Sequence, residues 1–174
     1  PVDCAPTPAG TPACPMDSPA TPPSARLRID LRALVDNWRQ FARLAAPARA
    51  SAVVKADAYG LGLAPVAGAL AAAGCTEFFV AGVDEALALR ALQPRATVYA
   101  LGGAPATTAP LLAAHAIVPV LNTPDEVREW VRTSGGAPAA LQLDTGMTRS
   151  GLGAPEIESL CADGDTLPRL NLVL

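Results

Sequence analysis

The sequence predicts an α/β protein, namely the first six βα units of a (β/α)8 TIM-type barrel. Short apolar runs alternate along the chain with segments of helical periodicity, which is the pattern of parallel strands joined by right-handed helical crossovers. Aromatic residues make up only 4% of a chain that is 51% hydrophobic, so small and branched aliphatic side chains must fill the core. No GxGxxG follows the first predicted strand, which argues against an open dinucleotide-binding sheet.

The first predicted elements are delimited by residues that start or stop regular structure. Asp30 caps a helix over 31–44 whose apolar residues recur at i, i+3, i+4 and i+7, and Pro47 lies beyond its end. The apolar run 52–54 predicts a buried strand that leads into a polar turn. The next elements are the turn at 55–60, a helix over 63–73 that ends at Gly74, a strand at 78–81, a helix over 83–92 that Pro94 stops, and a strand at 97–101.

The second half of the pattern contains a capping box. A helix over 107–115 precedes a short strand at 117–120, in which Pro119 lacks the N–H that a sheet ladder uses. Thr123, Pro124 and Glu126 form a capping box with proline at the first helical position, so a helix begins there. The remaining elements are a strand at 139–143, a helix over 155–162 and a strand at 170–174, within which we expect the chain to stop before the barrel closes.

Composition and charge exclude several classes of protein. The 13 basic and 16 acidic residues form no basic stripe that could neutralise a nucleic-acid backbone. No apolar run approaches the roughly 20 residues that cross a bilayer, and no signal peptide begins the chain, so we expect a cytoplasmic protein. Residues 1–25 hold eight prolines and are expected to form a flexible tail before the domain at 26–174.

The four cysteines predict neither a metal site nor a disulfide framework. They fall in no CxxC pair and have no histidine at ligand spacing, so zinc is not expected. A disulfide between the two in the proline-rich tail is formally possible, but free thiols are expected in a cytoplasmic chain. The four are Cys4, Cys14, Cys75 and Cys161.

Polar side chains gather where the predicted strands end, which is where barrel enzymes carry their working residues. Lys55 directly follows the first strand, so its ammonium is expected to be partly desolvated in the barrel wall. A lysine made nucleophilic in this way is what a Schiff-base enzyme needs, whereas a lysine that only extends to the rim has no chemical role. The other strand-end positions hold Asp57 and Tyr59, Asp84 and Glu85, Gly102 and Gly103, Asn122, and the loop 144–151.

The loop 144–151 combines two glycines with a permanent positive charge. Gly146 and Gly151 permit tight turns close to a ligand, and Arg149 offers a planar fork for a carboxylate or phenolate oxygen. The loop is equally compatible with an ordinary strand-to-helix connection in which Asp144 caps a helix or pairs with Arg149. Tyr59 also has two interpretations, since its hydroxyl could serve a ligand at the rim or its ring could be a half-buried part of the core.

Two segments resemble signatures of the alanine racemase family. Segment 53–62, Val-Val-Lys-Ala-Asp-Ala-Tyr-Gly-Leu-Gly, is similar to the family's pyridoxal phosphate attachment motif. Segment 143–151, Leu-Asp-Thr-Gly-Met-Thr-Arg-Ser-Gly, is similar to its second signature. Residues 28–31 resemble the family's opening and residues 171–174 the strand that comes next, so the resemblance covers the chain from about Arg26 to Leu174.

The resemblance implies a fold-type III pyridoxal phosphate enzyme that interconverts L- and D-alanine for peptidoglycan precursor synthesis, as a homodimer. Lys55 then corresponds to the lysine that binds the cofactor and transfers a proton, and Tyr59 to the tyrosine that hydrogen-bonds the cofactor phosphate. Arg149 corresponds to the arginine near the pyridine oxygen and the substrate carboxylate. Gln142 stands where many members carry a carbamylated lysine, so it can hydrogen-bond Arg149 but brings no negative charge.

The family's opposing catalytic tyrosine belongs to a C-terminal β-domain that we expect beyond this chain, so the fragment alone is expected to be inactive. Two alternatives stay open. One is a racemase of another amino acid, such as serine, because nothing in the sequence defines the side-chain pocket. The other is a non-catalytic, single-domain pyridoxal phosphate-binding protein of the same barrel type, which the two motifs disfavour.

Overall fold

The computed structural model describes residue 25 and residues 27–174. Apart from Ala25, the predicted tail over 1–25 and the Cys4–Cys14 pair lie outside these residues. Among the described residues, Cys75 and Cys161 are free thiols, and burial raises the pKa of the Cys75 thiol. No helix of the described part is long and apolar enough to cross a membrane.

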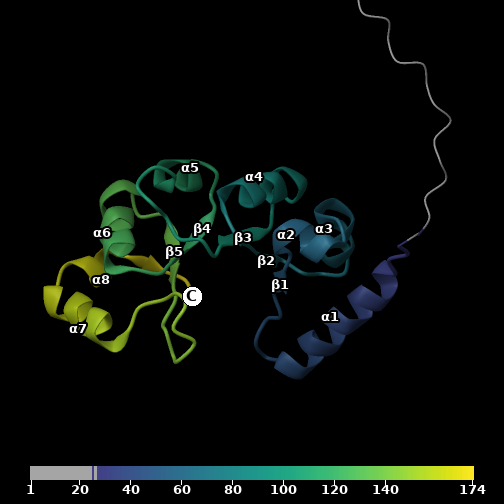
Figure 1. Ribbon diagram of the computed structural model, residues 1–174, viewed down its shortest axis with the longest axis horizontal. Coiled ribbons are helices and arrows are strands. Elements are labelled where there is room, and N and C mark those ends of the chain that lie inside the picture. Colours follow the sequence, from purple (N-terminus) through teal and green to yellow (C-terminus); the bar gives the residue numbers. More distant parts are fainter. Residues whose placement is uncertain (1–24, 26) are drawn as a thin grey trace, which may run out of the picture.

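Six parallel strands form one sheet in the order in which they occur along the chain. This order confirms the prediction of barrel-type βα units, because a doubly wound sheet would reverse its strand order at a switch point. Figure 1 shows the sheet curving through the inside of an arch with most of the helices along its outer side. The strands are β1 (Ala52–Val53), β2 (Glu77–Val80), β3 (Thr97–Ala100), β4 (Val118–Leu121), β5 (Pro138–Leu141) and β6 (Asn171–Leu172).

Two of the helices begin at the predicted caps, Asp30 and Thr123. Asp30 Oδ1 accepts the backbone N–H groups of Arg32 and Ala33 at 2.9 and 3.2 Å, which caps the first helix as predicted. Thr123 Oγ1 accepts the Glu126 N–H at 3.3 Å, which confirms half of the predicted capping box. The helices are α1 (Leu31–Ala45), α2 (Lys55–Gly60), α3 (Leu63–Ala72), α4 (Val83–Leu92), α5 (Ala109–Ala114), α6 (Pro124–Thr133), α7 (Ala154–Asp163) and α8 (Thr166–Arg169).

Three elements differ from the sequence-based predictions. The polar turn at 55–60 is the short, irregular α2, and β6 covers only two residues of the predicted strand 170–174. Helix α8 was not predicted, because four residues are too few to show a helical period. The buried Thr166 begins α8, and its hydroxyl donates to Asp163 Oδ2 at 2.8 Å, which joins α8 to the end of α7.

The two faces of the sheet carry separate apolar clusters. Phe78 and Val80 point from β2 into the larger cluster between the sheet and the helices. Phe79 lies on the opposite face, where its ring stacks on that of Tyr99 with a centroid distance of 4.4 Å and an interplanar angle of 9°. Strand alternation produces this separation, since successive side chains point to opposite faces. The second face is the one that the interior of a barrel would use.

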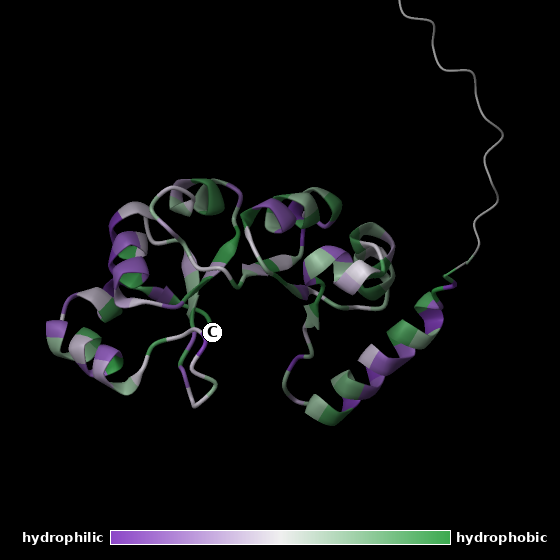
Figure 2. Ribbon diagram, viewed as in Figure 1, coloured by the Kyte–Doolittle hydropathy of each residue, from purple (hydrophilic) through white to green (hydrophobic). Residues whose placement is uncertain are grey.

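Helix α1 lies at one end of the arch. None of its residues is fully buried, although Leu34 and Trp38 pack against the main cluster with one side. Figure 2 shows the matching alternation of hydrophobic and hydrophilic residues along α1. The Trp38 indole N–H donates to the Ala50 carbonyl at 3.2 Å, which fixes the connection between α1 and β1.

Arg90 fixes the connections after α4 and α5. Its guanidinium donates five hydrogen bonds, all to backbone carbonyl oxygens, and burial lowers its pKa. The planar fork therefore replaces the water that these carbonyls would otherwise need. The accepting carbonyls belong to Gln93, Pro94, Ala96, His115 and Ala116.

Candidate functional site

Lys55 stands at the start of a left-handed turn. The four residues after it, 56–59, have φ angles between 52 and 57° and ψ angles between 36 and 52°. This backbone costs about 1–2 kcal/mol per residue for any residue other than glycine, and none of the four is glycine. Such strain persists only where the surrounding structure holds it, and it concentrates at functional sites.

Hydrogen bonds close the turn onto β1 and α3. The Ala58 N–H donates to the Val54 carbonyl at 3.0 Å, which returns the chain to the end of the strand. Asp57 Oδ1 accepts the Leu63 N–H at 2.6 Å and so caps α3 from within the turn. Asp57, predicted only as a strand-end polar residue, is therefore a structural cap. Ala58 itself is buried in the main cluster.

Glu85 holds the turn from the other side. Its Oε1 accepts the Ala56 N–H at 2.6 Å, and its Oε2 accepts the Ala81 N–H at 2.8 Å. One carboxylate thus bridges the turn after β1 and the end of β2. The sequence placed Glu85 at a strand end without a role. The signal that was available is its place as the third residue of α4, where a glutamate often reaches back to the preceding backbone.

A cavity of about 370 Å³ brings Lys55 and Arg149 together. Lys55 is half-buried, and it takes part in none of the ion pairs among the described residues. It is also the only lysine of the whole sequence. The cavity therefore combines one primary amine with one guanidinium. Its lining consists of Lys55, Ala81, Leu101, Gly102, Gln142, Arg149 and Ser150.

The loop that carries Arg149 is shaped by Asp144. Asp144 Oδ1 accepts the backbone N–H groups of Thr148 and Gly146 at 2.9 and 3.0 Å, and these bonds lower the pKa of the carboxyl group. Asp144 therefore neither caps a helix nor pairs with Arg149, which corrects both alternatives. A side chain at Gly151, where φ is 101°, would press on the backbone N of Asp144 and on Gln142. The loop is thus folded on itself and presents Arg149, which is exposed, at the cavity.

Gln142 shares the cavity with Arg149 but is bonded to another residue. Its Nε2 donates to Ser150 Oγ at 3.0 Å, so the structure pairs it with Ser150. Among the described residues, the Arg149 guanidinium has no hydrogen-bond partner and can bind a ligand. The serine next to Arg149 thereby becomes part of the cavity wall.

Tyr59 lies apart from the other two predicted site residues. Its side chain is 63% exposed and does not line the cavity with Lys55 and Arg149. The interpretation as a half-buried core aromatic is therefore wrong. The left-handed turn directs Tyr59 outward instead, four residues after Lys55, so any contact it makes with a ligand takes place at the outer edge of the site.

The strand-end residues of β3 and β4 have packing roles. A Cβ at Gly102 would lie 2.9 Å from the Ala81 carbonyl oxygen, and one at Gly103 would collide with the Glu126 carboxylate. Asn122 Nδ2 donates to the carbonyls of Leu101 and Val120, at 3.1 and 2.8 Å. These residues join neighbouring strand ends. They supply no acid, base or nucleophile to the cavity.

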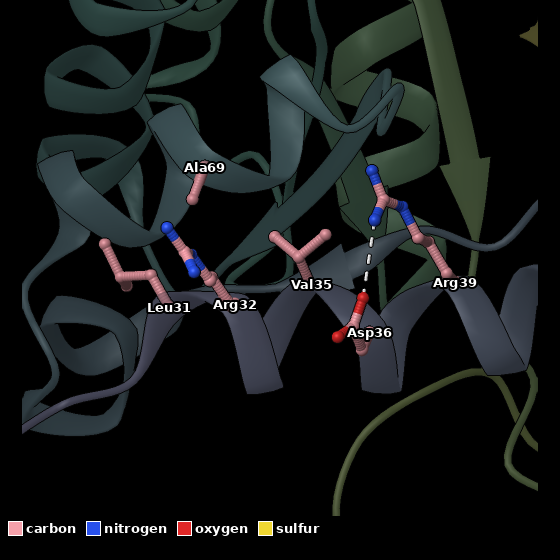
Figure 3. A pocket seen from close by; sticks show the side chains of 6 residues that line it. All are labelled: Leu31, Arg32, Val35, Asp36, Arg39 and Ala69. Atoms are coloured by element: carbon pink, nitrogen blue, oxygen red, sulfur yellow. Dashed lines mark hydrogen bonds and ion pairs between the residues drawn. The ribbon is translucent and has the colours of Figure 1, made fainter.

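Other cavities of similar size lack the amine. The one in Figure 3, of about 420 Å³, lies between α1 and α3 and contains an Asp36–Arg39 ion pair at 3.3 Å. A third, of about 430 Å³, adjoins the cavity of Lys55 and shares Arg149 with it. Among the described residues no group of histidine, cysteine or acidic side chains could hold a metal ion. The cavity of Lys55 is therefore the candidate for covalent or acid–base chemistry.

Comparisons with known proteins agree on one family. The family description "Alanine racemase, N-terminal domain" matches residues 29–174. The alanine racemase of Methylobacterium nodulans is 48% identical over 143 residues, which cover 80% of this chain and 39% of that protein. The alanine racemase of Brucella ovis is 46% identical over 151 residues, which cover 84% of this chain and 38% of that protein.

Solved structures show the same fold. The crystal structure of alanine racemase from Bartonella henselae with covalently bound pyridoxal phosphate matches with a TM-score of 0.78 and 38% identity, over 83% of this chain and 42% of that one. A histidine racemase from Leuconostoc mesenteroides matches with a TM-score of 0.68 and 26% identity, over 82% of this chain and 39% of that one. The chain thus spans about two fifths of the length of these relatives.

Proposed function

This chain belongs to the alanine racemase family, through its match to the family's N-terminal domain, and we propose that it forms the pyridoxal phosphate-binding part of an enzyme that interconverts L- and D-alanine. One observation carries the proposal. The only lysine of the sequence begins a strained turn at the carboxyl end of a barrel strand and faces a cavity that it shares with Arg149. Barrel enzymes place their chemistry at this end of the strands.

The residues of the cavity fit pyridoxal phosphate. A volume of about 370 Å³ lies within the usual range for small-molecule sites, about 300–1,000 Å³. Ala81 and Gly102 give one wall of the cavity little side-chain bulk, and a Cβ at Gly102 would lie 2.9 Å from the Ala81 carbonyl oxygen. Lys55 would hold the cofactor through its amine, Arg149 would bind the pyridine oxygen and the substrate carboxylate, and the Tyr59 hydroxyl would bind the phosphate at the outer edge.

When bound, pyridoxal phosphate acts as an electron sink that makes the Cα proton of an amino acid acidic. Lys55 Nζ would remove or return that proton on one side of Cα. A racemase needs a second acid–base group on the opposite side, because one group can deliver a proton from one side only. We propose that residues outside this chain supply it, from a second protomer of a homodimer, so that the isolated chain does not racemise alanine.

The substrate assignment has one rival. The structural similarity to a histidine racemase supports a second candidate, a racemase that acts on another amino acid. The high identity to relatives named alanine racemase favours alanine. We place the reaction in the cytoplasm, where thiols such as those of Cys75 and Cys161 stay reduced, and assign its product, D-alanine, to peptidoglycan synthesis.

The test is racemisation by the complete protein loaded with pyridoxal phosphate. L-Alanine, L-serine and L-histidine are offered separately, and the D-enantiomer is measured by chiral chromatography. The proposal predicts that D-alanine forms fastest and that Lys55→Arg, which keeps the charge but not the nucleophile, abolishes turnover. Arg39→Ala, at the cavity of Figure 3, serves as the control and should leave turnover unchanged. Full activity of Lys55→Arg would contradict the assignment.

A further inference from the structure

Two glutamates occupy the same position in two helices but make different contacts. Glu85 is the third residue of α4 and Glu126 the third residue of α6. Each accepts a backbone N–H at the end of the strand before its helix, from Ala81 at 2.8 Å and from Asn122 at 2.8 Å. Only Glu85 has a second bond to a backbone N–H, that of Ala56, which belongs to the preceding βα unit.

We propose that Glu85 is the positioning residue of Lys55, an inference that rests on the proposed function. The Ala56 N–H belongs to the peptide group that starts at the carbonyl carbon of Lys55. Its bond to Glu85 Oε1 measures 2.6 Å and is charge-assisted, because the acceptor is a carboxylate. The carboxylate therefore fixes the first peptide plane of the left-handed turn, and with it the direction in which Lys55 leaves the strand.

The same carboxylate also fixes the opposite wall of the cavity. Its other oxygen holds the Ala81 N–H, and Ala81 lines the cavity together with Lys55. The backbone of Glu85 is held in place, because the next residue of α4, Ala86, is fully buried in the main cluster. Glu85 thus sets the spacing between the amine and the wall that would face the cofactor.

A carboxylate suits this role better than the isosteric amide. The two backbone groups that meet Glu85 are both donors, and a carboxylate can accept from both. A glutamine offers one oxygen and one NH2 group, so one of the two N–H groups would face another donor. Glu126 accepts only one backbone N–H, so Glu126→Gln can keep its bond by orienting the oxygen toward Asn122.

The experiment compares Glu85→Gln with the matched control Glu126→Gln. Hydrogen exchange of the Ala56 amide is measured without cofactor. Covalent capture of pyridoxal phosphate on Lys55 is measured by borohydride reduction and peptide mass spectrometry, which assigns the adduct to the peptide that contains Lys55. We expect Glu85→Gln to speed exchange at Ala56 by about ten- to a hundredfold, the equivalent of one charge-assisted hydrogen bond. We also expect it to slow capture about tenfold.

The control separates positioning from general loss of stability. Glu126→Gln should change exchange at Ala56 and capture at Lys55 by less than twofold. In the loaded enzyme Glu85→Gln should lower kcat about tenfold with little change in KM for alanine, because Arg149 is untouched. Equal effects of the two variants, or unchanged Ala56 exchange in Glu85→Gln, would overturn the inference.

If the proposed function is wrong, the unsubstituted protein captures no pyridoxal phosphate on Lys55. If only the role of Glu85 is wrong, the unsubstituted protein still captures it. If Glu85→Gln does not fold, the unsubstituted protein still decides the matter. An Ala56 amide that exchanges at least about tenfold more slowly than an unstructured amide supports the hydrogen bond to Glu85. Exchange at the unstructured rate overturns it.

Discussion

An alanine-to-glycine substitution should stabilise the protein in the left-handed turn and destabilise it in a right-handed helix. Ala56 is exposed and has φ 52° and ψ 52°, a conformation that costs alanine about 1–2 kcal/mol. Glycine adopts it freely but loses about 0.5–1 kcal/mol more backbone entropy on folding. The Ala56→Gly variant should therefore be more stable than the unsubstituted protein by about 0.5–1 kcal/mol.

Ala88 provides the control, because it is an exposed residue inside the right-handed helix α4. Ala88→Gly should destabilise the protein by about 1 kcal/mol. Thermal unfolding followed by circular dichroism measures both variants, and a domain of this size should shift by about 2–4 °C per kcal/mol. The two midpoints should move in opposite directions. A loss of stability in Ala56→Gly as large as that in Ala88→Gly would refute the strain argument.

Three further predictions concern residues that shape the scaffold. Arg90→Lys should lower the free energy of unfolding by about 2 kcal/mol in urea titrations, because an ammonium cannot serve five carbonyls at once. Gly103→Ala should cost about 1–2 kcal/mol in the same assay, because φ is 76° and the added Cβ would displace the Glu126 carboxylate that accepts the Asn122 N–H; unchanged stability would contradict this. The pKa of Asp144 is lowered in the folded state, so its contribution is present above the ordinary value of 3.8 and disappears as pH falls through the lowered pKa. The Thr148 amide should therefore lose its protection from hydrogen exchange, relative to an unstructured amide at the same pH, as the pH falls through this lowered pKa, and it should be less protected in Asp144→Asn at neutral pH.

The strand order followed from the sequence because each strand is an apolar run bounded by strong local signals. Asp30, Pro94 and Thr123 stop or start helices through their own backbone and side-chain chemistry, which needs no knowledge of the fold. Right-handed crossovers then leave few arrangements for parallel strands in chain order. The positions of Lys55 and Arg149 at one cavity follow from the same rule, since the carboxyl ends of parallel strands meet.

The remaining features depend on contacts that local patterns do not encode. The residues of the left-handed turn favour right-handed backbone by themselves, and part of what holds the turn is Glu85, 29 residues further along the chain. Asp144 has two possible partners in the sequence, and only the folded loop shows that its carboxylate binds Thr148 and Gly146. The outward direction of Tyr59 is a consequence of the same turn.

The most direct measurement of the central claim is the site of cofactor attachment. The complete protein is incubated with pyridoxal phosphate, reduced with borohydride, digested and examined by peptide mass spectrometry. We predict one stoichiometric pyridoxyl adduct, on the peptide that contains Lys55, and none in Lys55→Arg. Full-strength labelling elsewhere in the protein, or no labelling at Lys55, would contradict the assignment of this turn and cavity as the cofactor site.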